Sequence, residues 1–547
     1  MNADHLRPLV DSADAARPLL ASWGVKEAVR GHENLSALAA RLGLDGLASL
    51  APPLSRLLPR AADPDRALNS LERFFAHPAA PPLVPLLLEG RARALEILLH
   101  LFSASQMFSD LLAQHPDYLE MLRVPLRKTP ALADLRESLR QDVEAAYEDS
   151  AVLRAFRRFR HMQLLRIGTN DIVRERPLEE ITRDISRVAD VAIEAALATA
   201  QRHVARRFGE PMAEGRPVPC CVLAFGKLGG EELNYSSDID LMFLYSEEGQ
   251  SQGKRISSIP TDEWFGRVVG EAVRLLGANS DLGQAYRVDL RLRPEGPRGP
   301  LARSLDSALG YYDTLGRTWE RQALIKARPV AGDLALGARF LQGVEGFVWR
   351  RYLSFAEINE IKALKRQIEH RARQAGTDDR EVKTGRGGIR DIEFTLQFLQ
   401  LLNGGDLPAV RQRNTLAALS ALEEAKCLTD QEYRVLEDAY RFLRKTEHRL
   451  QLLFDLQTHR LPEGEDELAK LALRMGYGRN RDPAPLRTRR RGRPQPARPD
   501  DPASLPAPAP KEPREAFLRD YRLKSEPTRN AEIPKLWSVL LIFFGFV

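Results

Sequence analysis

Two aspartates separated by one residue follow a glycine-rich stretch near the middle of the chain. Residues 225–241 read FGKLGGEELNYSSDIDL, in which Asp238 and Asp240 are the paired acids. In a β-strand, side chains two positions apart project from the same face, with their Cα atoms about 7 Å apart. A third acid, Asp289, holds the same kind of polar position between apolar residues in AYRVDLRLRP. If the two strands pair, three carboxylates converge on one site.

Converging carboxylates repel each other unless a cation neutralises them. Mg²⁺ suits such oxygen ligands, because it keeps several waters and takes phosphate oxygens as its other ligands. Two ions held roughly 4 Å apart stabilise the attacking and the leaving oxygen at one phosphorus atom. The pattern therefore predicts a nucleotidyl-transfer site with Asp238, Asp240 and Asp289 as catalytic metal ligands. For an isolated Asp-x-Asp pair, the alternative is a solvated strand face.

The glycine-rich turn before the acids favours the same chemistry. Glycine lets phosphate oxygens approach backbone N–H groups, and hydroxyl and cationic side chains add further donors. The turn is not a P-loop, because Leu rather than Ser or Thr follows its Gly-Lys pair. The candidate nucleotide- and phosphate-binding residues are Gly226, Lys227, Gly229, Gly230, Ser236, Ser237, Arg291 and Arg293. A plain turn, an exposed turn lysine and an exposed strand edge remain alternatives for the glycines, the lysine and the arginines.

Hydrophobic patterning places this site in a small sheet between helical regions. PVPCCVLAF, SSDIDLMFLY and AYRVDLRLRP have the short apolar or alternating runs that are typical of strands. Apolar residues at three- and four-residue spacing predict helices over most of the remaining chain. The predicted class is α+β, predominantly α, with a small mixed sheet flanked by large helical regions. The predicted parts are a helical region at 1–200, a nucleotidyltransferase core at 201–335, a helical bundle at 336–478 and a divergent, disordered tail at 479–547.

Composition and charge exclude several classes of protein. The net charge is +6, but residues 479–499 alone hold eight arginines and one aspartate, so the rest of the chain is nearly neutral. This distribution argues against nucleic acid as a partner and weakens an RNA-directed nucleotidyltransferase. The three cysteines lack disulfide or metal-ligand spacing, and no signal-peptide core is present, so a cytoplasmic location is expected. No apolar run reaches the roughly 18 residues of a membrane helix, and the final LWSVLLIFFGFV is too short.

Several long blocks of this sequence resemble the glutamine synthetase adenylyltransferase family, which consists of large, two-headed, cytoplasmic bacterial proteins. The resemblance runs from about residue 90 to residue 478. It is carried by LLRIGTNDI, FGKLGGEELNYSSDIDLMFLY, YRVDLRLRPEGPRGPL, TWERQALIKARPVAGD, VKTGRGGIRDIEFTLQFLQ and EHRLQLLFDLQTHRLP. The resemblance implies a polymerase-beta-like nucleotidyltransferase fold with a helical companion, and a Mg²⁺-dependent catalytic set at Asp238, Asp240 and Asp289. GGEELNYSSDIDL is similar to the family's amino-terminal head, which removes AMP from glutamine synthetase.

The resemblance implies a reaction and a set of partners. Inorganic phosphate would attack the adenylyl phosphorus of an AMP-tyrosine on glutamine synthetase and release ADP. The expected partners are glutamine synthetase, nucleotide (ATP or ADP), phosphate and a PII nitrogen-signalling protein. The acids do not fix the direction of transfer, so adenylylation from ATP stays open as an alternative.

The sequence also departs from the family pattern in two ways. One such block is present where the family has two heads, so a non-catalytic fragment that docks glutamine synthetase is a further alternative. The pattern ends after RMGYG, and the Arg/Pro/Ala-rich tail fits a truncated or frame-shifted reading. A single uninterrupted, properly terminated frame at the locus would contradict that hypothesis.

Charged residues in the later blocks are weaker candidates for binding nucleotide or phosphate. They are Glu320, Arg321, Lys326, Arg328, Lys383, Arg386 and Arg390. For each of them, a salt bridge between helices is the favoured interpretation. His448 lies on a strongly amphipathic helix and is predicted to be packed or hydrogen-bonded rather than catalytic.

Overall fold

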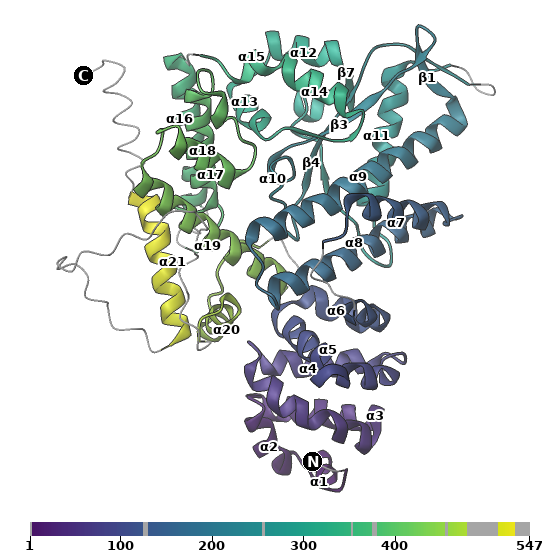
Figure 1. The fold of residues 1–547 in the computed structure, drawn as a ribbon, viewed down its shortest axis with the longest axis vertical. Helices are drawn as coiled ribbons and strands as arrows, with labels where there is room; N and C mark the ends of the chain where they lie inside the picture. The colour runs from purple at the N-terminus through teal and green to yellow at the C-terminus, as the bar shows by residue number, and fades with distance from the viewer. Residues whose placement is uncertain are drawn as a thin grey trace, which may run out of the picture.

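The molecule is built mainly from helices, with two small sheets among them (Figure 1). The computed structural model describes residues 3–123, 129–253, 258–351, 354–374, 380–454, 458–478 and 512–530. The predicted α+β class with a predominance of helix is confirmed. Within those ranges, no helix combines the length and the apolar character that crossing a bilayer requires. The apolar run LWSVLLIFFGFV lies outside the described residues.

The helices before the sheets stack upward from the N-terminus to the long pair α8 and α9 (Figure 1). They are α1 (Ala3–Asp11), α2 (Ala13–Ser22), α3 (Ala28–Leu57), α4 (Pro64–Ala76), α5 (Val84–Ala104), α6 (Gln106–Gln114), α7 (Leu132–Glu144), α8 (Asp149–Ile172) and α9 (Leu178–Phe208). One hydrophobic core runs from Leu6 in α1 into the sheet at Val222 and Ala331. Helix α9 crosses the boundary predicted at residue 200, so the first helical region and the sheet are packed as one body.

The central sheet has the strand order β6-β4-β3-β8, with β7 also paired to β4. Strand β4 pairs antiparallel with β3 but parallel with β6 and β7, so the sheet is mixed, as predicted. A separate small sheet has the order β2-β1-β5. The strands are β1 (Glu210–Ala213), β2 (Arg216–Pro217), β3 (Cys220–Ala224), β4 (Ile239–Tyr245), β5 (Gln250–Gln252), β6 (Val288–Asp289), β7 (Ala302–Ser304) and β8 (Arg328–Gly332).

The third predicted strand is much shorter than its sequence pattern indicated. AYRVDLRLRP was expected to continue as a strand through Leu292, but β6 ends at Asp289. The cause lies in Arg293, which is buried and whose guanidinium donates hydrogen bonds to the carbonyls of Leu290, Gly299 and Pro300. These bonds fold residues 290–300 into a loop. The alternation of the sequence predicts Arg291 and Arg293 on the same strand face as Asp289, and this prediction is wrong because both lie beyond the end of β6.

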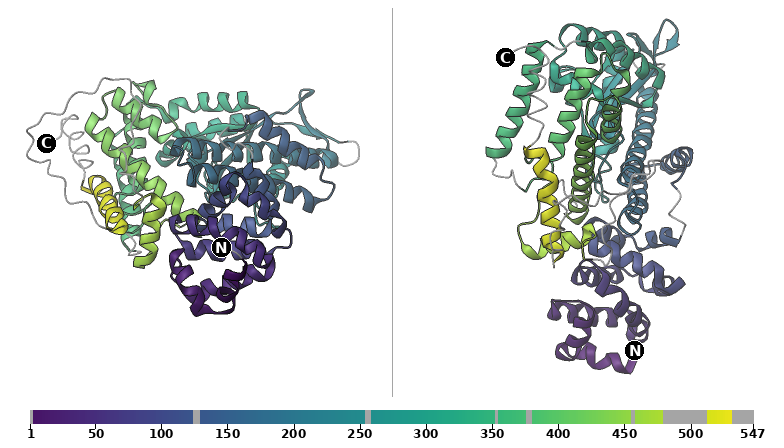
Figure 2. Two further views of the ribbon diagram at one scale, coloured as in Figure 1. Left: turned by 60° about the horizontal axis from the view of Figure 1, so that its bottom comes forward. Right: turned by 60° about the vertical axis from the view of Figure 1, so that its left-hand side comes forward.

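Later helices cover the face of the sheet opposite α9, and the helices that follow them form a bundle beside the sheet (Figures 1 and 2). Those on and around the sheet are α10 (Gly226–Gly229), α11 (Thr261–Gly277), α12 (Leu305–Thr314), α13 (Thr318–Ile325), α14 (Leu334–Gly343) and α15 (Glu345–Val348). Those of the bundle are α16 (Phe355–Gln374), α17 (Ile389–Asn403), α18 (Thr415–Glu424), α19 (Asp430–Phe454), α20 (Glu465–Met475) and α21 (Pro513–Asn530). Helix α14 crosses the boundary predicted at residue 335.

Helix α21 corrects the prediction that residues 479–547 have no fold. Its side chains Phe517 and Tyr521 are buried in the bundle core, and Phe517 lies 5.8 Å from the ring of Phe442 on α19. Tyr477 donates a 2.6 Å hydrogen bond to Asp520. Phe517 and Tyr521 are four positions apart and therefore lie on one face of the helix. The Arg/Pro/Ala-rich composition of the whole tail conceals this short pattern. Residues 479–511 and 531–547 lie outside the described residues.

Phe517→Ala is expected to release α21 from the bundle. The fully buried ring contacts aromatic residues of α19 and α21, so its truncation should cost about 3 kcal/mol of docking free energy. Limited proteolysis should then cut within 513–530 much faster than in the unmodified chain. Leu523→Ala is the matched control, since Leu523 lies on the same helix with 56% of its surface exposed. Equal cleavage rates for both variants would contradict the expectation.

Candidate functional site

Strands β4 and β6 bring the predicted acids together. The parallel register pairs Ile239 with Val288 and Asp240 with Asp289, and Asp238 directly precedes β4. Burial and, after it, the negative charges of Asp289 and Asp238 together raise the pKa of Asp240 to about 6. The carboxylates therefore act on one another, as the strand pattern predicted.

Two arginines face the outer acids. Arg287 donates a 2.6 Å hydrogen bond to Asp238 and a 2.7 Å bond to the carbonyl of Ser236. Arg291 contacts Asp289 through its backbone N–H and its guanidinium, and these hydrogen bonds lower the pKa of Asp289. Because Asp238 and Asp289 are directed to arginines, no group of three or more acidic, His or Cys side chains is arranged as a metal shell in the described part of the chain.

The three acids are nevertheless chemically suitable ligands for Mg²⁺. All three side chains are carboxylates, the ligand type that hard divalent cations prefer. Burial and the neighbouring charges of Asp289 and Asp238 raise the pKa of Asp240, so its negative charge is disfavoured at this position. A divalent cation between the three acids would compensate that charge.

The glycine-rich turn packs directly against Asp240. Gly226 has φ +54°, and a Cβ atom there would lie 2.7 Å from Oδ2 of Asp240. A Cβ on Gly229 would lie 1.9 Å from the carbonyl oxygen of Lys326, and one on Gly230 would lie 3.0 Å from that of Arg413. The three glycines thus allow the single helical turn α10 to fit between β4 and the neighbouring segments, which identifies a packing requirement for each of them.

Gly229→Ala is expected to disrupt this turn. The added methyl group would overlap a backbone carbonyl that belongs to a different segment, so the turn or the strand next to it must move. We expect a loss of about 3 kcal/mol in the free energy of unfolding, measured by urea titration. Gly266→Ala should have the opposite sign, because Gly266 lies inside α11 with open space around its Cβ position. Equal stability of the two variants would contradict this account.

Lys227 is held by a carboxylate of the bundle. Its ammonium lies 2.9 Å from Oε1 of Glu447, a fully buried residue of α19, and Glu447 also contacts His459 at 3.0 Å. Burial lowers the pKa of Lys227 to about 8, although Glu447 opposes the shift. Burial raises the pKa of Glu447, but Lys227 and His459 outweigh it and hold that pKa well below its ordinary value. Lys227 is therefore not an exposed turn lysine, and its contact with phosphate stays a prediction.

The remaining candidates in this segment have mixed surroundings. The backbone N–H of Ser236 lies 3.4 Å from the side-chain oxygen of Gln451, and its carbonyl accepts from Arg287. Ser236 and Ser237 are both partly exposed beside Asp238. Arg293 is committed to backbone carbonyls of its own loop, as described above. Phosphate binding by these residues stays a prediction.

Comparison with known proteins places this arrangement in a family. Residues 95–343 match the family described as glutamate-ammonia ligase adenylyltransferase, and residues 360–491 match the GlnD PII-uridylyltransferase family. The chain is 40% identical over 336 residues to the bifunctional glutamine synthetase adenylyltransferase/adenylyl-removing enzyme of Thioalkalivibrio sulfidiphilus. It is 39% identical over 357 residues to the protein of that name from Pseudomonas aeruginosa and 38% identical over 430 residues to that from a Bradyrhizobium species.

The chain belongs to the glutamine synthetase adenylyltransferase family. The matches cover 61%, 65% and 77% of this chain and 34%, 36% and 43% of those three relatives. The chain therefore spans well under half the length of the curated relatives it matches. The resemblance drawn from the sequence blocks is confirmed.

In this member of the adenylyltransferase family, several later candidates form buried or partly buried ion pairs. Arg321 pairs with Glu357 at 2.7 Å, Arg328 makes a two-point contact with Asp190, and Glu320 accepts from Tyr311 and the backbone of Arg317. The pair of Arg321 on α13 with Glu357 on α16 is the expected salt bridge between helices, whereas Arg328 joins β8 to α9 and Glu320 is held by hydrogen bonds rather than by a salt bridge. Lys326 is also paired, since its ammonium lies 2.8 Å from Oε2 of Glu232.

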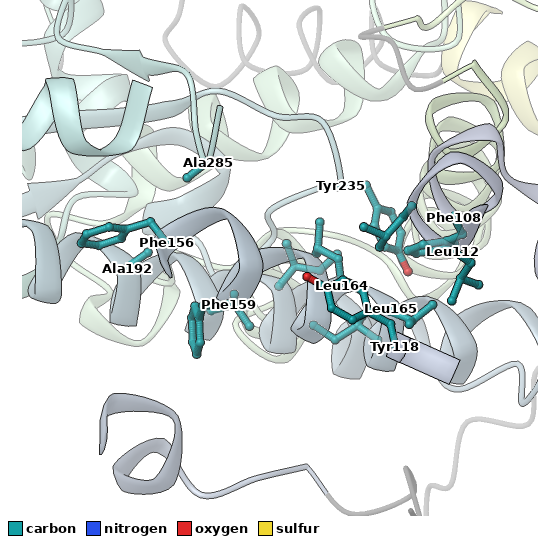
Figure 3. Close-up of a cluster of buried hydrophobic side chains, with 14 of the residues drawn as sticks. Phe108, Leu112, Tyr118, Phe156, Phe159, Leu164, Leu165, Ala192, Tyr235 and Ala285 are labelled. Carbon is teal, nitrogen blue, oxygen red and sulfur yellow. The ribbon is translucent and has the colours of Figure 1, made fainter. Parts of the chain in front are cut away.

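His448 is also structural, as predicted. Its Nε2 lies 2.9 Å from the side-chain oxygen of Asn234, and its ring meets Tyr235 edge-on at 5.4 Å. Tyr235 in turn donates to Asp171 and packs near Phe108, Leu164 and Leu165 of the helices before the sheet (Figure 3). The segment that precedes the acids is thus anchored between α8 and α19.

The sequence patterns missed three residues of this family member's site. Arg287, Glu447 and Glu232 each contact a predicted site residue or its neighbour, and none was singled out. Arg287 directly precedes β6. Because the pairing of this strand with β4 was anticipated, the position of Arg287 beside Asp238 could have been predicted from the sequence. Glu447 is 220 positions from Lys227, and no local pattern connects them.

Proposed function

We propose that this chain removes AMP from an adenylyl-tyrosine of glutamine synthetase by Mg²⁺-dependent phosphorolysis. The observation that carries the proposal is the parallel pairing of Asp240 with Asp289 beside the glycine turn at Gly226. The names of the relatives, which include an adenylyl-removing activity, support the same reaction class. The similarity of GGEELNYSSDIDL to the amino-terminal head of the family favours removal over attachment.

The proposed step is an in-line displacement at one phosphorus atom. An oxygen of inorganic phosphate forms a bond to the adenylyl phosphorus, and the bond from that phosphorus to the tyrosine oxygen breaks, giving ADP and a phenolate that takes up a proton. The phenolate is a tolerable leaving group because its conjugate acid has a pKa of about 10. Asp238, Asp240 and Asp289 would hold Mg²⁺, which supplies charge neutralisation at the phosphoryl oxygens.

The chain's own residues would position the reactants. The backbone of the glycine turn lies against Asp240, so nucleotide phosphates near this turn would be held close to the acids. Arg287 and Arg291 already lie on Asp238 and Asp289, where their guanidinium groups are available to phosphate oxygens once the acids take another partner. The proposed protein partners are glutamine synthetase and a PII protein, and the proposed location is the cytoplasm.

The test is to incubate the purified chain with Mg²⁺, inorganic phosphate and AMP-modified glutamine synthetase and to measure ADP. We expect ADP in amounts equal to the tyrosine groups freed, and none when phosphate is omitted. A parallel reaction with ATP and unmodified glutamine synthetase measures attachment of AMP. Attachment without removal would reverse the proposed direction, and a folded protein that binds glutamine synthetase without either activity would be a docking fragment.

A further inference from the structure

A lysine of the bundle acts on the acid site through its positive charge. The positive charge of Lys383, which precedes α17, lowers the pKa of Asp240 and also that of Lys227. Lys383 is partly exposed. It thus differs from Lys326 and Arg328, whose charges are taken up by Glu232 and Asp190.

A tight turn fixes the backbone of Lys383. The N–H of Val382 donates a 2.7 Å hydrogen bond to the carbonyl of His459, and the carbonyl of Lys383 accepts a 2.9 Å bond from the N–H of Arg390. A Cβ on Gly388 would lie within 3 Å of the carbonyl oxygens of Val382, Gly385 and Lys383, so glycine is required there. The sequence KTGRGG therefore builds a rigid support rather than a loose loop.

The same turn places Lys383 next to the glycine turn of the site. Val382 is bonded to the backbone of His459, and the His459 side chain contacts Oε1 of Glu447. That oxygen is the one that Lys227 contacts at 2.9 Å. The turn that carries Lys383 and the turn that carries Lys227 are thus connected through His459 and Glu447, and Asp240 lies within the field of Lys383.

The charges of the two lysines are balanced differently. Glu447 compensates Lys227, whereas no carboxylate forms a salt bridge with Lys383 among the residues that the structure describes. The nearest acid of its own segment is Glu381, whose pKa burial raises and whose carboxyl accepts from the backbone N–H of Lys383. The ammonium of Lys383 therefore carries charge that an oxyanion at the site would neutralise.

We infer that Lys383 is a phosphate-binding residue of the acid site, contributed by the bundle. Its ligand is a phosphate oxyanion, either inorganic phosphate or a phosphate group of the nucleotide. An ammonium is a compact point charge with three donors, and it binds phosphate oxygens without requiring a planar arrangement. The inference rests on the proposed function for the identity of the reaction, but its binding step is measured without turnover. It also means that the site is completed only when the bundle is docked on the sheet.

The experiment measures binding of inorganic phosphate and of ATP to the full chain by calorimetric titration, without glutamine synthetase. Lys383→Met should weaken binding of at least one of the two about tenfold, and Lys383→Arg should keep most of it. Lys426→Met is the matched control, since Lys426 lies on the same bundle with 82% of its side chain exposed. Thermal unfolding of each variant verifies that the fold is unchanged.

Each outcome has one meaning for Lys383. Weaker binding of phosphate alone assigns it to inorganic phosphate, and weaker binding of ATP assigns it to a nucleotide phosphate. Unchanged affinities for both ligands in a folded Lys383→Met chain, or the same loss in Lys426→Met, would overturn the inference. So would a failure of the unmodified chain to bind either ligand at millimolar concentration. Failure of the proposed function is a separate result, because it would appear as absent ADP formation in a chain that still binds phosphate through Lys383.

Discussion

Asp240→Asn should lower the rate of AMP removal by at least about a thousandfold. Asp240 is the acid that lies opposite Asp289 in the strand register and against Gly226, so it is central to the proposed site. Loss of a metal-ligating carboxylate removes several kcal/mol of charge stabilisation in the transition state, and each 1.36 kcal/mol is a factor of ten in rate. The measurement is ADP formation from AMP-modified glutamine synthetase at saturating phosphate.

The same substitution should leave the fold intact and, without added metal, make it no less stable. Asn keeps the shape of the side chain while it removes a negative charge crowded by Asp289 and Asp238. Thermal unfolding at pH 7 should therefore give an unchanged or higher midpoint. Asp313→Asn is the control for activity, because Asp313 is an exposed acid on α12. A variant at position 240 that retains more than a tenth of the activity would remove Asp240 from the catalytic set.

The arrangement of the acids could be predicted because it depends on local patterns. Two acids that are two positions apart on a strand project from the same face. A single pairing between strands then places Asp289 beside Asp240. The length of β6, the strand that carries Asp289, could not be predicted in this way. Its alternation continues past Asp289, but the buried guanidinium of Arg293 competes for the backbone carbonyls and ends the strand.

The partners of the glycine turn lie beyond such patterns. Lys227 is predicted to contact phosphate or to be an exposed turn lysine, and Lys326 to bind nucleotide or phosphate or to form a salt bridge. No local pattern identifies Glu447 as the partner of Lys227 or Glu232 as the partner of Lys326. The Lys227–Glu447 pair exists because the bundle docks on the sheet, and the Lys326–Glu232 pair joins residues 94 positions apart, so both depend on packing between segments that are distant in the chain. Helix α21 was missed for a different reason, since a Pro/Arg-rich surrounding sequence hid the short apolar pattern of Phe517 and Tyr521.

Glu232→Gln is expected to destabilise the chain by about 3 kcal/mol. Glu232 is buried and contacts Lys326 at 2.8 Å and the hydroxyl of Thr415 at 3.0 Å, and it also accepts from the backbone N–H of Thr415. Because Lys326 is buried as well, loss of the carboxylate leaves its ammonium with Glu393, at 3.5 Å, as its remaining salt-bridge partner among the described residues. Breaking one side of a buried pair typically costs about 3–5 kcal/mol, whereas an exposed pair is worth about 1 kcal/mol or less.

Urea unfolding of four chains separates this pair from a general effect of charge removal. Glu263→Gln is the control, because Glu263 pairs with Arg267 on the surface of α11 with both side chains 46% exposed, and its midpoint should barely change. Lys326→Met alone should also be destabilising, but the double variant with Glu232→Gln should lose less than the sum of the two single losses. Additive losses would mean that the two charges do not depend on each other. Glu232 would then stabilise the chain through Thr415 of the bundle rather than through Lys326.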